Sequence, residues 1–497
     1  MALGSLESLP PETIDNIASF LDTPDLSAFR LLNHYLETFA ARWHFEEVRC
    51  RTSSFCRDRQ AMVHIAKSTK LNQLVREVNL LIELPASLPF YPNLDVNIEE
   101  TLGAMVWDDR HHFATAAHVL PFLSHFRHLT TLRLIFIENP EVEPNTQVSS
   151  DVINYQSGII ETIFQCLTGT WPLERQTRID EALKLVLGDE YSAGCSAFPG
   201  PGPVSLRTLW IKNLNVPLHS RVRKSEAFKA VVGSGSIVDL SCINRNYVRW
   251  PIAPGPLYSR EVLKMFEQMP RTWFMPSMAE NLQNLELKFH NYWGWHPKLD
   301  LEDITPALPN LKKLSLWRFV FSLERQAQWI ASLGRSNSSG GLEGLHLHKC
   351  QILFGVTHLE PLDRDTGYLV QEDMLRAVLL NGEQLQCSFF TPRWYTILDI
   401  WRESMPALTS FQLNRYTHES DFTAQKNRRI GSRVLGYKFI DFMRWPIYLY
   451  VPDVPPPGET GHLRPGERGC LEMDEEAADL LFSAVRSRNW PASRQNV

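Results

Sequence analysis

Two histidines and a cysteine at alternate positions are the first residues that could bind a metal. His346, His348 and Cys350 would lie on one face of a strand, because side chains two residues apart point the same way. A zinc site usually takes its four ligands in pairs, and no second pair accompanies these residues. The sequence therefore favours polar histidines on the exposed face of a strand, and it predicts no bound metal and no cofactor.

A run of aromatic residues, Tyr292-Trp293-Gly294-Trp295-His296, has the composition of a surface on which a sugar or base stacks. No basic residues surround it, so nucleic-acid binding is not expected. Aromatic clusters of this kind more often form a small satellite core. The pair His111-His112 has no ligand pattern nearby and is expected at the surface.

Catalytic motifs are missing from the sequence. It has no His-Glu-x-x-His, no phosphate-binding Gly-x-x-x-x-Gly-Lys and no Gly-x-Ser-x-Gly nucleophile elbow. It also has no Cys-x-x-Cys pair, so a RING-type zinc site is not available. A hydrolase or transferase with an unrecognised site is the weakest alternative, because no nucleophile, base and orienting group can be proposed together. We therefore expect a protein that is not an enzyme and has no catalytic residues.

The composition is that of an ordinary globular chain. It has 497 residues, 44% of them hydrophobic and 21% charged, with a formal charge of −6. This balance excludes a strongly basic footprint for nucleic acid or for an anionic membrane. No signal peptide is recognisable, and the late apolar stretch 439–451 is too short and too charged to span a bilayer. Eight scattered cysteines predict reduced thiols, so we expect a cytoplasmic or nuclear protein.

The first 50 residues predict three short helices joined by tight turns. Pro10 and Pro11 suit a first helical turn, where a missing N–H costs nothing. Asn33 is a good N-cap for the third helix. A unit of about 40 residues rarely supports a core of its own. Its apolar face, with Ile14, Ile17 and Leu21, is therefore expected to be exposed and to bind a partner.

These residues resemble the F-box, a motif that docks on the Skp-type adaptor of a cullin–RING ubiquitin ligase. The resemblance covers about residues 6–50 and rests on Leu9-Pro10-x-Glu12-x-Ile14-x-x-Ile17, Leu21, Asp25-Leu26 and Arg30-Leu31-Leu32-Asn33. It implies a Skp-type adaptor, and through it a cullin, as partners. By this resemblance, the adaptor-binding residues are Leu9, Pro10, Ile14, Ile17, Leu21 and Leu26. The aromatic residue that often follows the second helix is not matched clearly, and an ordinary helical hairpin packed on the main domain is the alternative.

From about residue 70 a pattern of leucines recurs. The segment Leu342-x-x-Leu345-x-Leu347-x-x-Cys350 fits the strand of a leucine-rich repeat. Looser copies begin at residues 75, 129, 206, 282, 311 and 408, and 237–242 and 385–390 are further candidate strands. One such unit cannot bury its apolar row alone, so neighbouring copies are expected to stack. An unrelated α/β domain with several buried strands is the alternative.

The spacing of these copies is irregular, which indicates insertions. We expect an α/β fold in which a three-helix F-box-like module, residues 1–50, precedes an irregular leucine-rich-repeat-like α/β solenoid, residues 51–451. Residues 452–497 are predicted to form a proline-rich linker and a last helix. The run of glycine and serine at 334–341 is predicted to be a flexible connection.

Alternate residues of the predicted strands form an outward row suited to binding a protein. Its charge is mixed, and Trp and Arg are the residue types most enriched in interface hot spots. The candidate substrate-binding residues are Arg133, Trp210, Lys212, Glu286, Lys288, Trp317, His346 and His348. Whether inserted loops cover Trp210 and Trp317 stays open.

The sequence thus predicts a substrate-recognition adaptor of an SCF-type ubiquitin ligase, without nucleic-acid or membrane binding. The N-terminus would bind the Skp-type adaptor, and the repeat domain would hold an unknown substrate protein. The alternative is a repeat scaffold for protein interactions, unconnected to ubiquitin ligation, whose N-terminal helices serve only as a cap.

Overall fold

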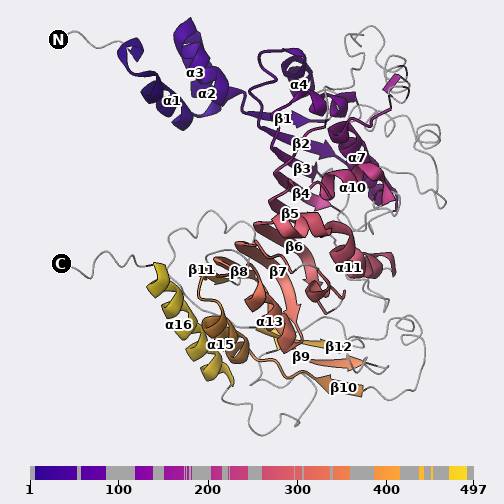
Figure 1. Ribbon diagram of the computed structural model, residues 1–497. Coiled ribbons are helices and arrows are strands. Elements are labelled where there is room, and N and C mark those ends of the chain that lie inside the picture. The colour runs from indigo at the N-terminus through magenta and orange to yellow at the C-terminus, as the bar shows by residue number, and fades with distance from the viewer. Residues whose placement is uncertain are drawn as a thin grey trace, which may run out of the picture. The chain divides into compact units, whose positions relative to one another are not determined.

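The chain folds into an α/β structure with N-terminal helices and a mostly parallel sheet (Figure 1). The computed structural model describes residues 6–52, 57–84, 118–137, 150–172, 203–214, 224–244, 260–295, 297–304, 307–335, 340–358, 386–414, 436–441, 449–450 and 470–489, with a few single residues between. Contacts divide the chain into two compact units, residues 1–236 and 237–497. The predicted boundaries at residues 50 and 451 fall inside these units, and the linker predicted at 452–469, like His111-His112, lies outside the described residues.

The three predicted N-terminal helices are present. They are α1 (Pro11–Phe20), α2 (Thr23–Leu32) and α3 (His34–His44). Asp22 caps α2 by accepting a hydrogen bond from the Asp25 N–H at 2.9 Å, and Asn33 caps α3 in the same way through the Leu36 N–H at 2.8 Å. The connections between these helices are therefore very short, and each contains a polar residue that caps the helix that follows.

The first unit continues with a ladder of four parallel strands. Their bounds are β1 (Glu47–Arg51), β2 (Glu77–Glu83), β3 (Thr131–Ile137) and β4 (Thr208–Leu214). They pair in chain order and in register, so residues at the same place in each strand form rows across the sheet. Strands β2 to β4 follow the leucine pattern, whereas β1 was not predicted and lies partly within the residues assigned to the helical module.

Helices cover one face of this ladder. Helices α4 (Arg57–Lys67), α7 (Ser150–Thr168) and α10 (Glu226–Val232) lie along the same side of the strands (Figure 1). The leucines of the repeated pattern bury their side chains on one face, as Leu132 and Leu134 do at 0% exposure. The alternate residues therefore stand on the opposite face, which forms the row discussed below.

The second unit holds a second parallel ladder. Its strands, in order of pairing, are β5 (Asp239–Asn244), β6 (Asn284–Trp293), β7 (Lys313–Phe321), β8 (Gly344–His348) and β11 (Ser410–Asn414). All of them coincide with predicted strands. Helix α13 (Glu324–Ser332) packs against β7, and helix α15 (Trp394–Ser404) packs between α13 and the last helix, α16 (Cys470–Asn489).

A smaller set of strands departs from this repetition. The far end of β7 pairs with β9 (Gln351–His358), which also pairs with β10 (Gln386–Phe389) and β12 (Gly436–Asp441); β12 in turn pairs with the two-residue strand β13 (Leu449–Tyr450). Strand β10 had been considered a missed repeat, but it runs antiparallel to β9 and is outside the parallel ladder. Trp295 and Phe390 pack together here, and Tyr292 packs against this cluster. Trp293 is also buried, so the two tryptophans of the aromatic run belong to the core rather than to a binding surface, whereas His296 lies outside the described residues.

Three strands share one uncommon backbone feature. Asn213, Arg318 and Lys349 have positive φ angles of 60°, 59° and 54°, a conformation that few residues other than glycine adopt. Each stands two positions after a buried aliphatic residue, which is Ile211, Leu316 or Leu347. Nearby, Asn213 Nδ2 donates to the Phe136 carbonyl at 2.8 Å, and Cys350 Sγ donates to the Leu316 carbonyl at 3.3 Å. In both cases a side chain at the strand end bonds to the preceding strand.

Candidate interaction surfaces

The N-terminal helices enclose a small core of their own. Its buried residues are Ile14, Ala18, Leu26, Phe29, Leu36 and Ala40. Trp43 packs on this core and donates from Nε1 to Asp15 Oδ1 at 2.9 Å, while Arg42 forms an ion pair with the same carboxylate at 3.3 Å. These contacts join α1 to α3.

The six residues predicted to bind an adaptor divide between core and surface. Ile14 and Leu26 are 0% and 5% exposed, so they hold the helices of the module together. Leu9, Ile17 and Leu21 are half-buried, and Pro10 is exposed. The expectation of an exposed face made by Ile14, Ile17 and Leu21 is therefore wrong for Ile14, because the three helices pack closely enough to cover it.

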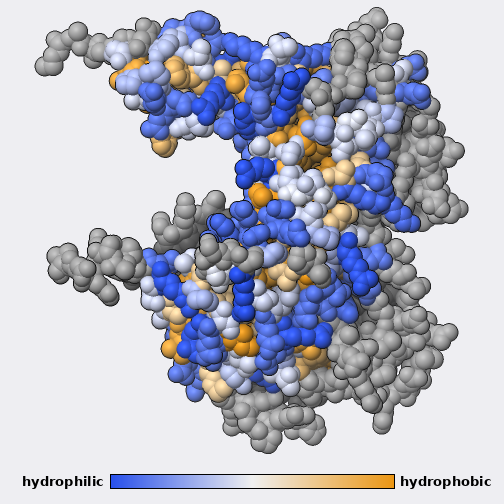
Figure 2. Space-filling view, viewed as in Figure 1, coloured by the Kyte–Doolittle hydropathy of each residue, from blue (hydrophilic) through white to orange (hydrophobic). Residues whose placement is uncertain are grey.

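A different set of apolar residues is exposed on the same helices. Phe20, at the end of α1, is 83% exposed, and Leu31 and Leu32, at the end of α2, are 86% and 62% exposed. Tyr35 follows at 40%. Orange hydrophobic surface is visible on this part of the molecule in Figure 2. We call these four residues the apolar module surface. The sequence analysis named Leu31 and Leu32 as part of the F-box resemblance, but it placed none of the four among the predicted adaptor-binding residues.

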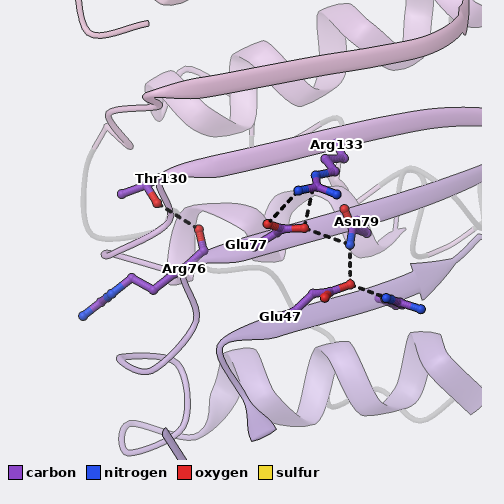
Figure 3. Close-up of polar contacts among 7 residues, drawn as sticks. Glu47, Arg76, Glu77, Asn79, Thr130 and Arg133 are labelled. Carbon is purple, nitrogen blue, oxygen red and sulfur yellow. Dashed lines mark hydrogen bonds and ion pairs between the residues drawn. The ribbon is translucent and has the colours of Figure 1, made fainter. Parts of the chain in front are cut away.

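A second surface is the outward face of β1 to β4. Arg49 pairs with Glu47 at 2.5 Å, and Arg133 pairs with Glu77 through Nε at 3.2 Å. Asn79 lies between these ion pairs and donates from Nδ2 to Glu47 at 2.5 Å and to Glu77 at 3.1 Å. Figure 3 shows this network, in which opposite charges are joined across three strands.

The network also affects ionisation. Burial opposes the charged form of Glu47, but hydrogen bonds from Arg49 and Asn79 outweigh it and lower the pKa of Glu47. The hydrogen bond to Glu47 in turn raises the pKa of Arg49. Among the candidate substrate-binding residues of this unit, Arg133 is exposed, and Trp210 and Lys212 are half-buried on the same face.

The other five candidate residues meet on the outward face of the second unit. Lys288 Nζ lies 4.0 Å from the centroid of the Trp317 ring, and that ring stacks on His348 at 4.3 Å. His346 Nε2 is 3.1 Å from Ser410 Oγ, and Glu286 Oε2 accepts from Ser241 Oγ at 2.6 Å. The residues share a face as predicted, but Trp317 and His348 are only 9% and 6% exposed. The two rings cover each other, so the expectation of an exposed position is wrong for His348.

Cys350 faces away from these histidines. Its thiol is buried and donates to backbone carbonyls of Leu316 and His348, and burial raises the pKa of the thiol to about 12. A thiol that remains protonated is a poor metal ligand. Among the described residues, no cluster of three or more His, Cys, Asp or Glu side chains could hold a metal ion.

Acidification is expected to destabilise the second unit through His348. Burial, together with smaller contributions from His346 and Lys288, lowers the pKa of His348 to about 4. The unfolded chain takes up a proton near pH 6.5 that the folded chain resists, so stability is lost as the pH falls below about 6.5. Between about pH 7 and pH 5 the loss should be about 2 kcal/mol in the free energy of unfolding, measured by urea titration.

His348→Phe is the matched variant for this pH dependence. It keeps a ring against Trp317 but cannot be protonated, so its stability should fall less over the same pH range. Equal slopes for the variant and the wild type would show that His348 is not the group responsible.

Comparisons with known proteins leave the family open. No protein-family model matches the chain, and no curated protein matches it. In the parts of the chain that the structure describes, every helix is too short or too polar to cross a membrane.

Proposed function

We propose that the chain is a non-catalytic substrate-recognition adaptor of an SCF-type ubiquitin ligase. In this proposal α1 to α3 are an F-box-like module that binds a Skp-type adaptor and, through it, a cullin. The two strand ladders, as an irregular leucine-rich-repeat-like region, hold the substrate protein. Ubiquitin transfer would be favoured by proximity, because binding raises the local concentration of substrate lysines near the charged conjugating enzyme.

The single observation that carries the proposal is the apolar module surface. Phe20 and Leu31 are more than four-fifths exposed although they belong to helices with a formed core. Several large exposed apolar side chains on one small module are a feature of surfaces that bind another protein. At about 25 cal/mol per Å², covering them would contribute several kcal/mol to binding.

The repeat interpretation of the body has its own support. The parallel strands are in register, and the positive φ recurs at Asn213, Arg318 and Lys349, which each stand two positions after a buried aliphatic residue of the repeated pattern. Such recurrence is expected when similar units stack on one another.

An interaction scaffold unconnected to ubiquitin is the second candidate. Helix α3 ends at His44 and β1 begins at Glu47, so the helices stand directly before the first strand, where a capping element would be. Capping elements present a polar outer face. The exposure of Leu31 and Leu32 therefore favours the docking module.

Capture by an immobilised Skp-type adaptor tests the proposal. The full-length wild type should bind, and the double variant Phe20→Ser/Leu31→Ser should bind at least about 30-fold more weakly, because it removes roughly 2 kcal/mol or more of apolar burial. Both positions are exposed, so the variant should fold normally, which circular dichroism can verify.

Leu480→Ser is the matched control. Leu480 is also exposed, at 46%, but lies on α16 in the other unit. Its replacement should leave adaptor binding unchanged. A folded wild type that does not bind the adaptor would refute the ligase proposal and leave the scaffold.

A further inference from the structure

On the outward face of β1 to β4, acidic and basic residues lie in different rows across the strands. The strand register aligns Glu47 with Glu77 near the start of the strands. The next row holds Arg49, Asn79, Arg133 and Trp210, and the row after it holds Arg51, Leu81, Ile135 and Lys212. Two adjacent rows thus contain four cationic side chains and no carboxylate.

The arginines of these rows are accessible. The side chains of Arg49, Arg51 and Arg133 are 74%, 50% and 46% exposed. Arg49 and Arg51 form their ion pairs, with Glu47 and Glu83, through Nε. A guanidinium has five N–H donors, so each arginine can also bind a carboxylate of a partner.

Apolar side chains lie between the cations. Leu81 and Ile135 are half-buried and lie in the middle of the row that runs from Arg51 to Lys212. Trp210 is also half-buried and is the last residue of the row that begins with Arg49. Half-buried apolar groups retain surface that a partner can cover. The face therefore offers apolar contact in the middle and positive charge around it.

Asn79 adds a polar acceptor to the floor of this face. Its amide nitrogen donates to two carboxylates, which fixes the orientation of the amide. Figure 3 shows its oxygen pointing away from them. This oxygen is buried, Asn79 is 7% exposed, and no described residue donates a hydrogen bond to it. A buried acceptor without a donor costs about 1–3 kcal/mol.

We propose that this face binds an acidic protein segment that also contains apolar residues. The acidic side chains would pair with Arg49, Arg133 and Lys212, and the apolar ones would cover Leu81, Ile135 and Trp210. A nucleic acid fits less well, because its continuous phosphates would also meet Glu47 and Glu77. The inference rests on the proposed function only in taking this segment to be part of the ligase substrate.

Fluorescence anisotropy of the full chain with a short labelled peptide rich in glutamate and leucine tests the inference. The wild type should bind this peptide, and Arg49→Gln/Lys212→Gln should weaken binding about tenfold. The control variant Lys229→Gln/Arg271→Gln, with the same change of charge on helices α10 and α11 (Arg260–Trp273), should bind like the wild type. A peptide with lysine in place of glutamate should not bind.

Several outcomes would overturn the inference. They are no binding of the acidic peptide, equal loss in both variants, no loss in Arg49→Gln/Lys212→Gln, or displacement of the peptide by an equally long oligothymidylate. The same variants are also tested for capture by the Skp-type adaptor. If the adaptor captures the chain but the peptide does not bind, this inference is refuted and the proposed function is not. If the peptide binds but the adaptor does not capture the chain, the proposed function is refuted and peptide binding by this face is not.

Discussion

Gly334→Ala is expected to destabilise the second unit by more than about 3 kcal/mol. Gly334 follows α13 with a φ of +67°, and its N–H donates to the Leu308 carbonyl at 3.3 Å. A Cβ at this position would overlap the carbonyl oxygen of Leu311. Because that atom belongs to the backbone leading into β7, it cannot move aside as a flexible side chain would.

Gly340→Ala separates the steric effect from the conformational one. Gly340 has a similar φ of +81°, but an added Cβ would meet nothing within 4 Å. The variant should therefore lose only about 1 kcal/mol, the usual cost of a left-handed alanine. Denaturant unfolding of both variants measures the difference. Equal losses would mean that Leu311 does not constrain residue 334.

These two glycines also show a limit of the sequence analysis. The run at 334–341 was predicted to be a flexible connection, yet Gly334 packs against the backbone of Leu311. Composition alone does not distinguish a glycine in a flexible segment from a glycine that is required because another part of the backbone lies very close to it. The difference lies in a contact between residues from separate elements, and no local pattern records it.

The strands of the two ladders were more predictable. A parallel strand that packs helices on one face must repeat apolar residues at every second position, so Leu132 and Leu134, or Leu345 and Leu347, identify their strands directly. Strands β1, β9 and β12 lack this leucine phasing. Helix α7 also escaped prediction.

The candidate surfaces were predicted only in outline. The strand period placed Arg133, Lys288 and His348 on outward faces, which the register reproduces. Exposure within those faces depends on neighbouring strands, since Trp317 is buried by Lys288 and His348 on either side of it. The same applies to Leu31, whose exposure follows from how three helices pack and not from its own type.

Arg488→Met is expected to lower the free energy of unfolding by about 2–4 kcal/mol. The predicted last helix is present as α16, with Ala477, Ala478, Leu481 and Val485 buried and Leu480 exposed. From its last turn, Arg488 donates to the carbonyls of Arg402, Met405 and Leu408 at 3.0, 2.8 and 3.3 Å. Methionine would keep the packing of the side-chain stem but provide no donor.

Those carbonyls lie at and just beyond the C-terminal end of α15, where backbone oxygens have no partner within the helix. At the other end of α15, buried Asp474 accepts from the Tyr395 N–H at 2.8 Å. Helix α16 thus places a negative group at the positive end of α15 and a positive group at its negative end, which stabilises both. Losing one end should also loosen the buried contacts of Leu481 and Trp401, which tryptophan fluorescence during urea unfolding would report.

Arg486→Met provides the control, because it removes the same charge from the same turn of α16. Arg486 is exposed, and a surface change of this kind usually alters stability by less than about 0.5 kcal/mol. If Arg486→Met and Arg488→Met are equally stable, net charge rather than the three carbonyl contacts determines the effect. If only Arg488→Met unfolds at a lower urea concentration than the wild type, α16 stabilises the second unit through its contacts at both ends of α15. These contacts then also hold the last strand of the ladder, β11, in place.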